Sequence, residues 1–396
     1  MLVMEMSNKQ QQIPAIRFNG FTDTWEQRKL GDVVKNIGTG NSKFQIQEKS
    51  SDASYAILGS TSVIGYDNNF DFEGNFVLTA RVGANAGTLY QHSGKVKISD
   101  NTVYIQSDNL SFLYNLLNRF DLKKLSFGTG QPLVKSSELK KLALNFPNKE
   151  EQEKIGNFFN QLDYTIALHQ RELDNLKITK QVFMKKMFPK EGEKVPEVRF
   201  PGFMADWDYR KLGDVGETYT GLSGKSKDDF GHGRGKYVTY MNVFSNSIAN
   251  PSLVELVEID TKQNEVNPGD IFFTTSSETP EEVGMSSVWL ENSDNTYLNN
   301  FCFGYRPIEK FDNYYLAYML RSSVVRKKIT FLAQGISRYN ISKNKVMDIA
   351  VPIPVIEEQT KIGEFFKQLD DIINLQQQEL EKLKQTKQAF LQKMFI

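Results

Sequence analysis

The chain has 396 residues, and its 48 basic and 48 acidic side chains give a formal net charge of zero. Two or three domains with buried cores fit this length, and the single cysteine excludes an intrachain disulfide. We expect a cytoplasmic protein, because no run approaches the length of a membrane span and the N-terminus lacks the pattern of a signal peptide. Zero net charge argues against a free-standing, nonspecific DNA binder, although local basic surfaces and positively charged partners stay open.

The chain begins with residues 1–15, which we expect to be a flexible N-terminus. A leading motif follows, IRFNGFTDTWEQRKLGDV over 16–33, and it returns as VRFPGFMADWDYRKLGDV over 198–215. A repeat of this kind determines the architecture and has to be interpreted first. Trp25 and its counterpart Trp207 are expected to be packing anchors of the two leading motifs rather than base-stacking residues.

Each leading motif is followed by a body of unrelated sequence, over about 34–147 and 216–352. β-branched and aromatic runs separated by Gly, Asn and Asp predict strands and turns. These runs are 54–60, 75–80, 87–92 and 95–106 in the first body, and 236–244, 269–277, 286–292 and 298–307 in the second. A helical run follows in each body, over 111–125 and 313–329. Each body is therefore predicted to be a mixed α/β domain.

Both bodies end alike, with GTGQPLVKSSELKKLALNFP over 128–147 and AQGISRYNISKNKVMDIAVPIP over 333–354. Each ending has a Gly-containing turn, a short amphipathic segment, a β run and a proline, which keeps the chain extended. Two matching segments then follow, over 151–188 and 358–395, with about two thirds of their aligned positions identical. Glutamates at their starts and lysines at their ends suit the helix dipole, so both segments are predicted to be long helices.

Apolar residues in these two segments follow alternating steps of four and three, the period that keeps paired helices in contact. The predicted helix-pairing seam is Ile155, Phe159, Leu162, Ile166, Leu173, Leu176, Phe183, Met187, Ile362, Phe366, Leu369, Ile373, Leu380, Leu383, Phe390 and Met394. Both copies interrupt the seam at matching places, with His169 and Gln376 and then with Lys180 and Lys387. Such polar residues lower stability but specify register. The simpler alternative is that the helices only pack on separate domains.

Residues with catalytic or metal-binding chemistry are scattered. The three histidines, at 92, 169 and 232, and Cys302 have no zinc-ligand spacing, and no nucleophile–base arrangement is recognisable. We therefore expect no metal site and no catalytic residues in this chain.

The leading motifs RFNGF and RFPGF with KLGDV, the paired body endings and the twin EQ.KIG.FF.QLD helices closely resemble the specificity subunit of type I restriction-modification enzymes. The resemblance covers essentially the whole chain. It implies a mixed α/β fold with a pseudo-twofold repeat, in which two target-recognition domains are joined by two long antiparallel coiled-coil helices. On this basis the chain divides into the flexible N-terminus, domain 1 (16–148), a central helical region (149–190), domain 2 with a short linker (191–355) and a C-terminal helical region (356–396).

The resemblance further implies a non-catalytic subunit that reads a bipartite double-stranded DNA target, with one half-site per domain. It implies docking of two modification (methyltransferase) subunits and of restriction (translocase-nuclease) subunits. No cofactor is expected on this chain, whereas S-adenosylmethionine, ATP and magnesium are expected on the partners. Two dissimilar bodies on one repeated frame suit this role, because similar half-sites would need similar bodies.

Candidate DNA contacts lie in turn regions, where Arg and Lys can bind guanine edges or phosphate and Asn and Gln can bind adenine. They are Arg81, Asn85, Thr129, Gln131 and Lys135 in domain 1, and Ser276, Ser337, Arg338, Tyr339, Asn340 and Lys343 in domain 2. The small, Gly-rich segment 79–87 would let the backbone approach DNA closely, with Arg81 projecting. For each residue the alternative is a surface turn residue without a contact.

Two other functions remain open from the sequence. A coiled-coil interaction scaffold would show no salt-sensitive, sequence-selective DNA binding. A self-sufficient enzyme with an unrecognised site would turn over substrate as the purified chain alone.

Overall fold

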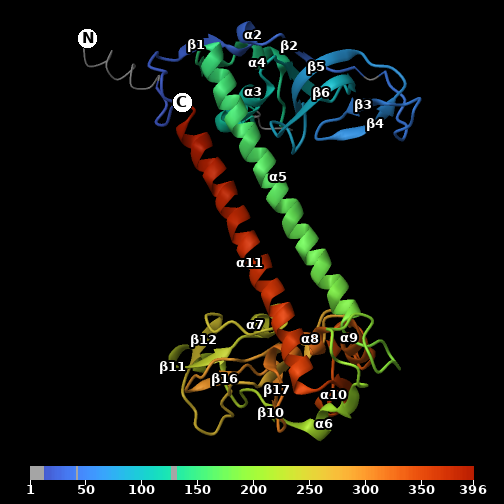
Figure 1. The fold of residues 1–396 in the computed structure, drawn as a ribbon. Helices are drawn as coiled ribbons and strands as arrows, with labels where there is room; N and C mark the ends of the chain where they lie inside the picture. Colours follow the sequence, from blue (N-terminus) through green and yellow to red (C-terminus); the bar gives the residue numbers. More distant parts are fainter. Residues whose placement is uncertain (1–12, 42, 126–131) are drawn as a thin grey trace. The chain divides into compact units, whose positions relative to one another are not determined.

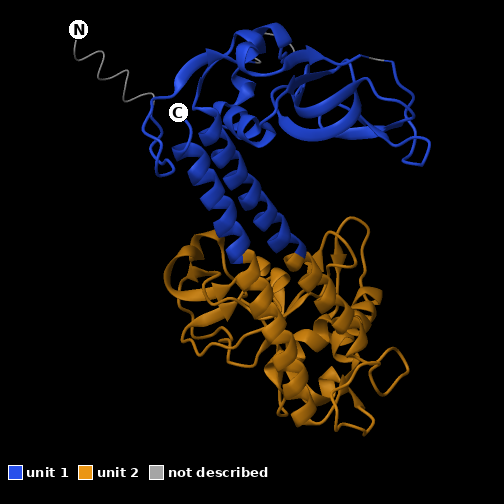
Figure 2. Ribbon diagram, turned by 45° about the horizontal axis from the view of Figure 1, so that its top comes forward, with its two compact units in different colours: residues 1–171, 378–396 blue, residues 172–377 orange. Residues whose placement is uncertain are grey.

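The computed structural model describes residues 13–41, 43–125 and 132–396, which form two compact units (Figure 2). Unit 1 contains the described residues up to Arg171 together with Gln378–Ile396, and unit 2 is Glu172–Gln377. Most of the expected flexible N-terminus, residues 1–12, lies outside the described residues. After it, Pro14 is buried and the backbone N–H of Ile16 donates to the carbonyl of Lys393 at 2.9 Å.

Two long helices, α5 (Lys149–Lys186) and α11 (Ile356–Lys393), connect the two globular domains (Figure 1). Each helix contributes one half to each unit. In unit 1 the rings of Phe158 and Phe390 lie 4.9 Å apart, and in unit 2 the rings of Phe183 and Phe365 lie 5.0 Å apart. Within each unit the first half of one helix therefore packs against the second half of the other. The mixed α/β fold with two domains and an antiparallel helix pair is as expected from the sequence.

The predicted seam residues are all buried or half-buried. Ile155, Phe159 and Met394 belong to the hydrophobic core of unit 1, and Ile362 and Phe366 to that of unit 2. The sequence-order division treats each long helix as a region of its own. In the structure each helix half shares a core with the neighbouring domain, because the seam continues into the domain interior.

The lysines that interrupt the seam form matching ion pairs. Lys387 lies 2.5 Å from Asp163 in unit 1, and Lys180 lies 2.5 Å from Asp370 in unit 2. Asp370 also accepts a hydrogen bond of 2.8 Å from the hydroxyl of Tyr318. Because a shifted register would separate these charges, the pairs favour one alignment of the two helices.

Domain 1 is built on a six-stranded sheet with the order β2-β7-β5-β6-β3-β4, and β1 and β8 form a separate antiparallel pair. The strands are β1 (Glu26–Lys29), β2 (Asn36–Thr39), β3 (Tyr55–Leu58), β4 (Val63–Asp67), β5 (Phe72–Ala80), β6 (Leu89–Ile98), β7 (Thr102–Gln106) and β8 (Ala143–Phe146). The helices are α2 (Leu30–Val33), α3 (Leu110–Phe120), α4 (Ser136–Lys141) and the 3-10 turn η1 (Leu122–Leu125). Asn109 caps α3 by accepting from the N–H of Phe112. The buried face of α3 packs in the core that also contains Trp25 and Phe395.

Domain 2 has a four-stranded sheet, β10-β17-β13-β15, a three-stranded sheet, β12-β11-β16, and the pairs β14-β18 and β19-β9. The strands are β9 (Asp208–Lys211), β10 (Gly216–Thr220), β11 (Phe230–Val238), β12 (Val254–Val257), β13 (Ile271–Thr274), β14 (Ser276–Ser277), β15 (Ser286–Val288), β16 (Thr296–Leu298), β17 (Cys302–Pro307), β18 (Tyr339–Asn340) and β19 (Ala350–Ile353). The helices are α6 (Leu212–Val215), α7 (Tyr240–Ser245), α8 (Asn313–Arg321), α9 (Ser323–Phe331), α10 (Lys343–Met347) and the 3-10 turn η2 (Lys227–Asp229).

One strand prediction in domain 2 is wrong. The run 236–244 continues as a strand only to Val238, and α7 begins at Tyr240. Thr239 caps this helix by accepting from the N–H of Asn242, and Arg321 donates to the carbonyls of Val243 and Phe244 near its end. These caps satisfy backbone groups that would otherwise lack partners, and they outweigh the β propensity of the run.

Several other predicted runs are divided in the structure, among them 269–277, 298–307 and 111–125, and two further runs show the reason. The run 95–106 is the end of β6 and all of β7, separated by a turn at residues 99–101. The helical run 313–329 is two helices, because Ser322 is extended and ends α8 before α9 begins. Short breaks of this kind leave the apolar pattern on both sides intact, so the pattern alone does not show them.

The two leading motifs have equivalent contacts in the two units. In unit 1, Arg17 forms a bidentate ion pair with the fully buried Glu151 at 2.6 and 2.7 Å. In unit 2, Arg199 forms the same pair with the fully buried Glu358 at 2.6 and 2.8 Å. Each pair joins a leading motif to the first turn of a long helix. The repeat therefore preserves the attachment of each domain to its helix.

The tryptophans of the leading motifs are packing anchors, as predicted. Trp25 is 1% exposed and its ring lies edge-on to Phe112 and Phe395. Trp207 is 2% exposed and packs against Phe188 and Tyr315. Neither indole ring is available for stacking on a base.

Candidate nucleic-acid interface

Arg81, one of the DNA-contact candidates of domain 1, directly follows β5. The N–H of Arg81 donates to the carbonyl of Asn101 at 2.8 Å, and the N–H of Val134 donates to the carbonyl of Arg81 at 2.8 Å. Val82 and Leu133 form an antiparallel β-bridge. The structure thus brings Arg81 next to the segment 132–135, from which the sequence selected Lys135.

The side chains of these candidates differ in what surrounds them. Arg81 and Asn85 are exposed, and Lys135 is exposed but forms an ion pair of 3.3 Å with Glu138. The loop over 79–87, which contains Arg81 and Asn85, is closed by a hydrogen bond of 3.0 Å from the N–H of Gly87 to the buried Thr79 hydroxyl. Thr129 and Gln131 lie outside the described residues.

Domain 2 has the same backbone arrangement at the end of β13. The N–H of Thr275 donates to the carbonyl of Phe301 at 3.0 Å, and the N–H of Ile341 donates to the carbonyl of Thr275 at 3.0 Å. Ser276 pairs with Asn340, and Ser277 with Tyr339. Residues that the sequence selected from two distant stretches, 276 and 337–340, are therefore adjacent in this domain.

Arg338 is an exposed cation whose side chain is held by a hydrogen bond. The Nε of Arg338 donates to the Ser276 hydroxyl at 3.3 Å, and the residue as a whole is exposed. Ser276 is only 5% exposed, and its carbonyl accepts from the Tyr240 hydroxyl at 2.8 Å. This burial argues against a direct DNA contact by Ser276, which instead orients Arg338. Ser337 and Asn340 are exposed, and Tyr339 and Lys343 are half-buried.

Sequence reasoning missed the loop over 278–284 and the residue that holds it. Arg326, on α9, donates to the carbonyls of Gly284, Glu281 and Val283 at 2.6, 2.8 and 2.7 Å. Burial lowers the pKa of the Arg326 guanidinium to about 10, so it stays charged at neutral pH. Three charge-assisted hydrogen bonds from one side chain keep the loop beside Ser276 in one conformation. No local sequence signal could have shown this, because the partners are backbone carbonyls more than 40 residues away.

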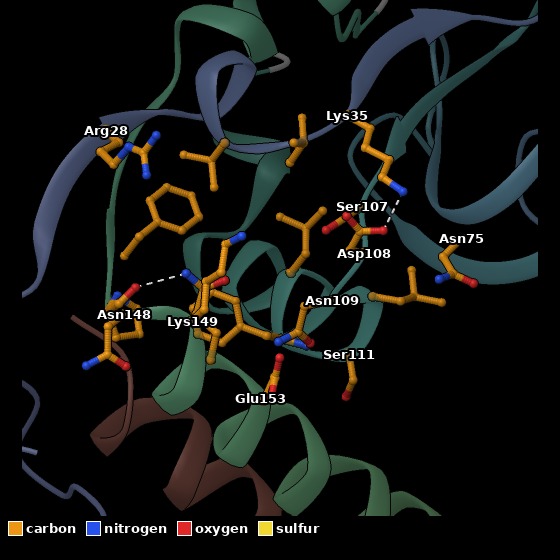
Figure 3. Close-up of a pocket in the computed structure, with 18 of the residues that line it drawn as sticks. Arg28, Lys35, Asn75, Ser107, Asp108, Asn109, Ser111, Asn148, Lys149 and Glu153 are labelled. Atoms are coloured by element: carbon orange, nitrogen blue, oxygen red, sulfur yellow. Dashed lines mark hydrogen bonds and ion pairs between the residues drawn. The ribbon is translucent and has the colours of Figure 1, made fainter.

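A cavity of about 1040 Å³ in unit 1 contains none of the selected residues (Figure 3). It lies between the first leading motif, the start of α3 and the start of α5, and Lys35 forms an ion pair of 2.5 Å with Asp108 at its rim. Its charged lining residues are Asp23, Glu26, Asp32, Asp108 and Glu153, against Arg28, Lys35 and Lys149. This excess of carboxylates does not suit the phosphate backbone of DNA.

Within residues 13–41, 43–125 and 132–396, no group of three or more His, Cys, Asp or Glu side chains is placed to hold a metal ion. In the same ranges no helix is both long and apolar enough to cross a membrane. Cys302 is buried, and its Sγ accepts a hydrogen bond of 3.3 Å from the side chain of Asn299.

Two domains of different build, each presenting turn residues from an equivalent backbone frame and each fastened to a shared helix pair, define a modular recognition protein. The chain matches the family described as "Type I restriction modification DNA specificity domain" over residues 22–177 and again over 204–385. Since the two matches together span most of the chain, the chain belongs to this family and contains two DNA-specificity domains. The role of such a chain is DNA recognition, with catalysis left to other subunits.

Relatives with similar sequence and fold span nearly the whole chain. The chain is 24% identical to the type I restriction enzyme MjaVIII specificity subunit of Methanocaldococcus jannaschii, over 93% of this chain and 91% of that protein. The crystal structure of the type I restriction-modification S subunit from M. genitalium is similar with a TM-score of 0.62 and 16% identity, covering 97% of this chain and 99% of that one. A structure from a study of complex assembly and conformational transition of the type I R-M system is similar with a TM-score of 0.55 and 16% identity, covering 94% and 97%. At these identities the structures show a shared fold.

Proposed function

We propose that this chain gives a type I restriction-modification complex its sequence specificity by reading a bipartite DNA target. Domain 1 reads one short half-site and domain 2 reads the other, with a nonspecific gap of fixed length between them. We call these the first and second half-sites. The chain acts in the cytoplasm as part of a larger complex.

The observation that carries this proposal is that the same Arg–Glu ion pair attaches two different domains. The ion pairs Arg17–Glu151 and Arg199–Glu358 attach the leading motifs to the helices in the same way. The domains that these ion pairs attach differ in their sheets. Domain 1 has a six-stranded sheet, whereas domain 2 has separate four- and three-stranded sheets. A protein that reads two unlike sequences needs two unlike surfaces held by a common frame, because base contacts specify sequence whereas the frame only positions them.

The helix pair supplies docking surfaces for two modification subunits. Apolar side chains outside the seam are exposed on it in both units. They are Tyr164 and Leu168 in unit 1, and Ile178, Val182, Ile372 and Leu375 in unit 2, with Tyr164 at 69% and Leu375 at 58% exposure. We take these side chains as candidate contact residues for the modification subunits, because protein-contact sites often contain exposed apolar groups. Restriction subunits complete the complex, and S-adenosylmethionine, ATP and magnesium are bound by these partners.

Zero net charge fits a subunit that works inside such a complex. Most of the affinity of a protein for duplex DNA comes from cations that neutralise phosphates. In the proposed complex the partners supply part of this positive charge, and the two domains supply base contacts.

The test is single-molecule sequencing of adenine methylation in the host genome, with this gene intact and deleted. One interrupted, two-part motif should lose methylation on deletion. Replacing only the body over 34–147 with that of another family member should then change the first half of the motif and leave the second half and the gap unchanged. The reciprocal exchange over 216–352 is the matched control.

An unchanged methylation pattern, with the modification subunit expressed and active, would contradict the proposal and favour a scaffold without DNA reading. A body exchange that altered both halves together would contradict the assignment of one half-site to each domain.

A further inference from the structure

The residues that follow α9 form a tight hairpin over 334–340, which we call the tip hairpin. Gln334 and Asn340 exchange two backbone hydrogen bonds, at 2.9 and 2.8 Å. Gly335 has a φ of +150°, and a Cβ at this position would lie 2.0 Å from the carbonyl oxygen of Arg338. Only glycine fits there, so the hairpin has a defined shape without any ligand.

The tip hairpin exposes an apolar side chain, that of Ile336. Ile336 is 96% exposed, and Phe331, the last residue of α9, is 89% exposed. Single exposed apolar residues are common on proteins and need no explanation by themselves. Here the exposed isoleucine lies two residues from Arg338, within the surface already selected as the DNA-contact surface of domain 2.

The charge around the tip hairpin indicates which kind of partner it meets. Residues 313–347 contain no Asp or Glu. Of the basic residues in this segment, Arg321, Arg326 and Lys328 donate to backbone carbonyls and Lys327 pairs with Glu191, whereas Arg338 and Lys345 are exposed and Lys343 is half-buried. Such a segment is unusual in a chain whose basic and acidic residues are equal in number. Arg338 lies on the hairpin, and Lys343 and Lys345 follow it closely in the sequence. Cations beside an exposed apolar tip fit DNA, because they attract phosphates while the apolar group can contact a base.

We propose that Ile336 makes a specificity-determining apolar contact with the C5-methyl group of a thymine in the second half-site. The major groove admits a two-stranded β-ribbon, and the thymine methyl is the apolar group that it displays. Arg338, on the same hairpin and oriented by Ser276, contacts a neighbouring base or phosphate. This inference rests on the proposed function, since it names one contact within the DNA reading assigned to domain 2.

The test removes the methyl group from the DNA and the side chain from the protein. The complex of this chain with its modification subunits is titrated with duplexes that carry the methylated motif, in which each thymine is replaced in turn by deoxyuridine. At one position in the second half-site, loss of the methyl group should weaken binding by wild type about fourfold, the factor expected for one buried methyl-sized group. The Ile336→Ala complex should bind the thymine and deoxyuridine duplexes equally well, and Ile336→Val should restore part of the difference.

Controls come from the same complex and the same duplexes. Deoxyuridine in the first half-site should affect wild type and Ile336→Ala equally. Met204→Ala removes another apolar side chain, 92% exposed and outside the tip hairpin, and should behave like wild type. Because Ile336 is almost fully exposed, its replacement should leave the thermal stability of the complex unchanged.

Three results would overturn the inference while leaving the proposed function intact. The first is a second half-site that has no thymine on either strand. The second is equal discrimination between thymine and deoxyuridine by wild type and Ile336→Ala at every thymine position. The third is weaker subunit assembly by Ile336→Ala with unchanged DNA discrimination. The last would place the tip hairpin against a protein partner. A wild-type complex without any sequence preference would instead contradict the proposed function itself.

Discussion

Arg338 and Arg81 are exposed, yet each lies on a backbone that hydrogen bonds hold in place. Arg338 is further oriented by the buried Ser276 hydroxyl, whereas Arg81 precedes a loop closed at Thr79 and Gly87. An arginine whose backbone is held in place loses little entropy on binding, and in Arg338 the Nε is held as well. Both features favour a directional contact of the remaining guanidinium N–H groups with guanine.

Replacing Arg338 by alanine should relax the second half-site only, and Arg81→Ala should relax the first half-site only. A bidentate arginine–guanine contact contributes about 1–3 kcal/mol of discrimination against the wrong base. The measurement is the methylation motif read by genome sequencing, together with binding to duplexes altered at single bases. Lys327→Ala is the control, because Lys327 is also exposed in this basic segment but pairs with Glu191. An equal loss of affinity for all sequences would indicate a phosphate contact instead.

Cys302 should be unreactive in the folded protein. Its side chain is buried, and burial raises the pKa of its thiol to about 12, so almost no thiolate is present at neutral pH. The rate of labelling by a thiol reagent should therefore follow the opening of domain 2 and rise with denaturant. Because this is the single cysteine of the chain, Cys302→Ala provides the background. Rapid labelling without denaturant would show that the β17 region is open in solution.

The long helices each contain one glycine at the place where the short helix of a domain meets them. A Cβ at Gly363 would lie 2.3 Å from Asp312 Oδ1 and 2.7 Å from the N–H nitrogen of Tyr315, at the start of α8. A Cβ at Gly156 would lie 2.8 Å from Asn109 Oδ1 and 3.2 Å from the nitrogen of Phe112, at the start of α3. Glycine thus allows close packing of the domain helix on the long helix, in spite of its low helix propensity.

Alanine at Gly363 should destabilise unit 2 by about 1–3 kcal/mol, as overpacked sites do, although alanine favours the helix by about 1 kcal/mol. Gly156→Ala should be less harmful, because the nearest atoms are farther away. Thermal and urea unfolding measure the two effects, and Gln378→Ala at an exposed site of α11 is the control. Higher stability in both glycine variants would mean that helix propensity outweighs the contact.

The ion pair Lys180–Asp370 should have a measurable coupling energy. Both side chains are about three-quarters buried, and Asp370 also accepts from Tyr318. A double-mutant cycle to alanine should give about 1 kcal/mol, at the upper end for partly exposed pairs. The matched control is Lys367–Asp371 on α11, which is more exposed and spaced by four residues, and for which about 0.3–0.5 kcal/mol is expected. Equal couplings would argue that the seam pair has no special role in register.

At the scale of the whole molecule, each unit is completed by the helix end of the other half of the sequence. Phe395 packs on Trp25 in unit 1, and Phe188, its counterpart in the repeat, packs on Trp207 in unit 2. Each half of the sequence consists of one leading motif, one body and one helix. Each half therefore contains a tryptophan site that such a phenylalanine fills and also a phenylalanine that fits this site.

A half-chain of residues 1–190 should associate into a symmetric dimer, in which Phe188 of each copy takes the place of Phe395. Sedimentation equilibrium should give twice the mass of the half-chain, with a dissociation that depends on concentration. Phe188→Ala should weaken this dimer by several kcal/mol, since removal of a buried phenylalanine costs about 3–5 kcal/mol. A stable monomer would contradict the equivalence of the two halves.

Periodicity predicted the two long helices α5 and α11 reliably, because their seam repeats the same local pattern many times. Composition predicted most strands, but it failed at 240–245, where capping by Thr239 and Arg321 converts a β-type run into α7. For the candidate site, the exposure of Arg81 and Arg338 follows from their turn contexts, whereas the burial of Ser276 does not. The DNA contacts of both arginines stay a prediction.

Comparison of the chain with itself is enough to predict two unlike domains on one repeated frame, because the leading motifs, the helix seams and the body endings are local patterns that occur twice. The three-dimensional fold was needed to show which distant segments meet. It placed 132–134 beside Arg81 and 339–341 beside Thr275, assigned Arg326 to the loop over 278–284, and left Ile336 exposed at the end of its hairpin. These contacts join residues tens of positions apart through backbone groups, which every residue carries, so no side-chain pattern in the sequence records them.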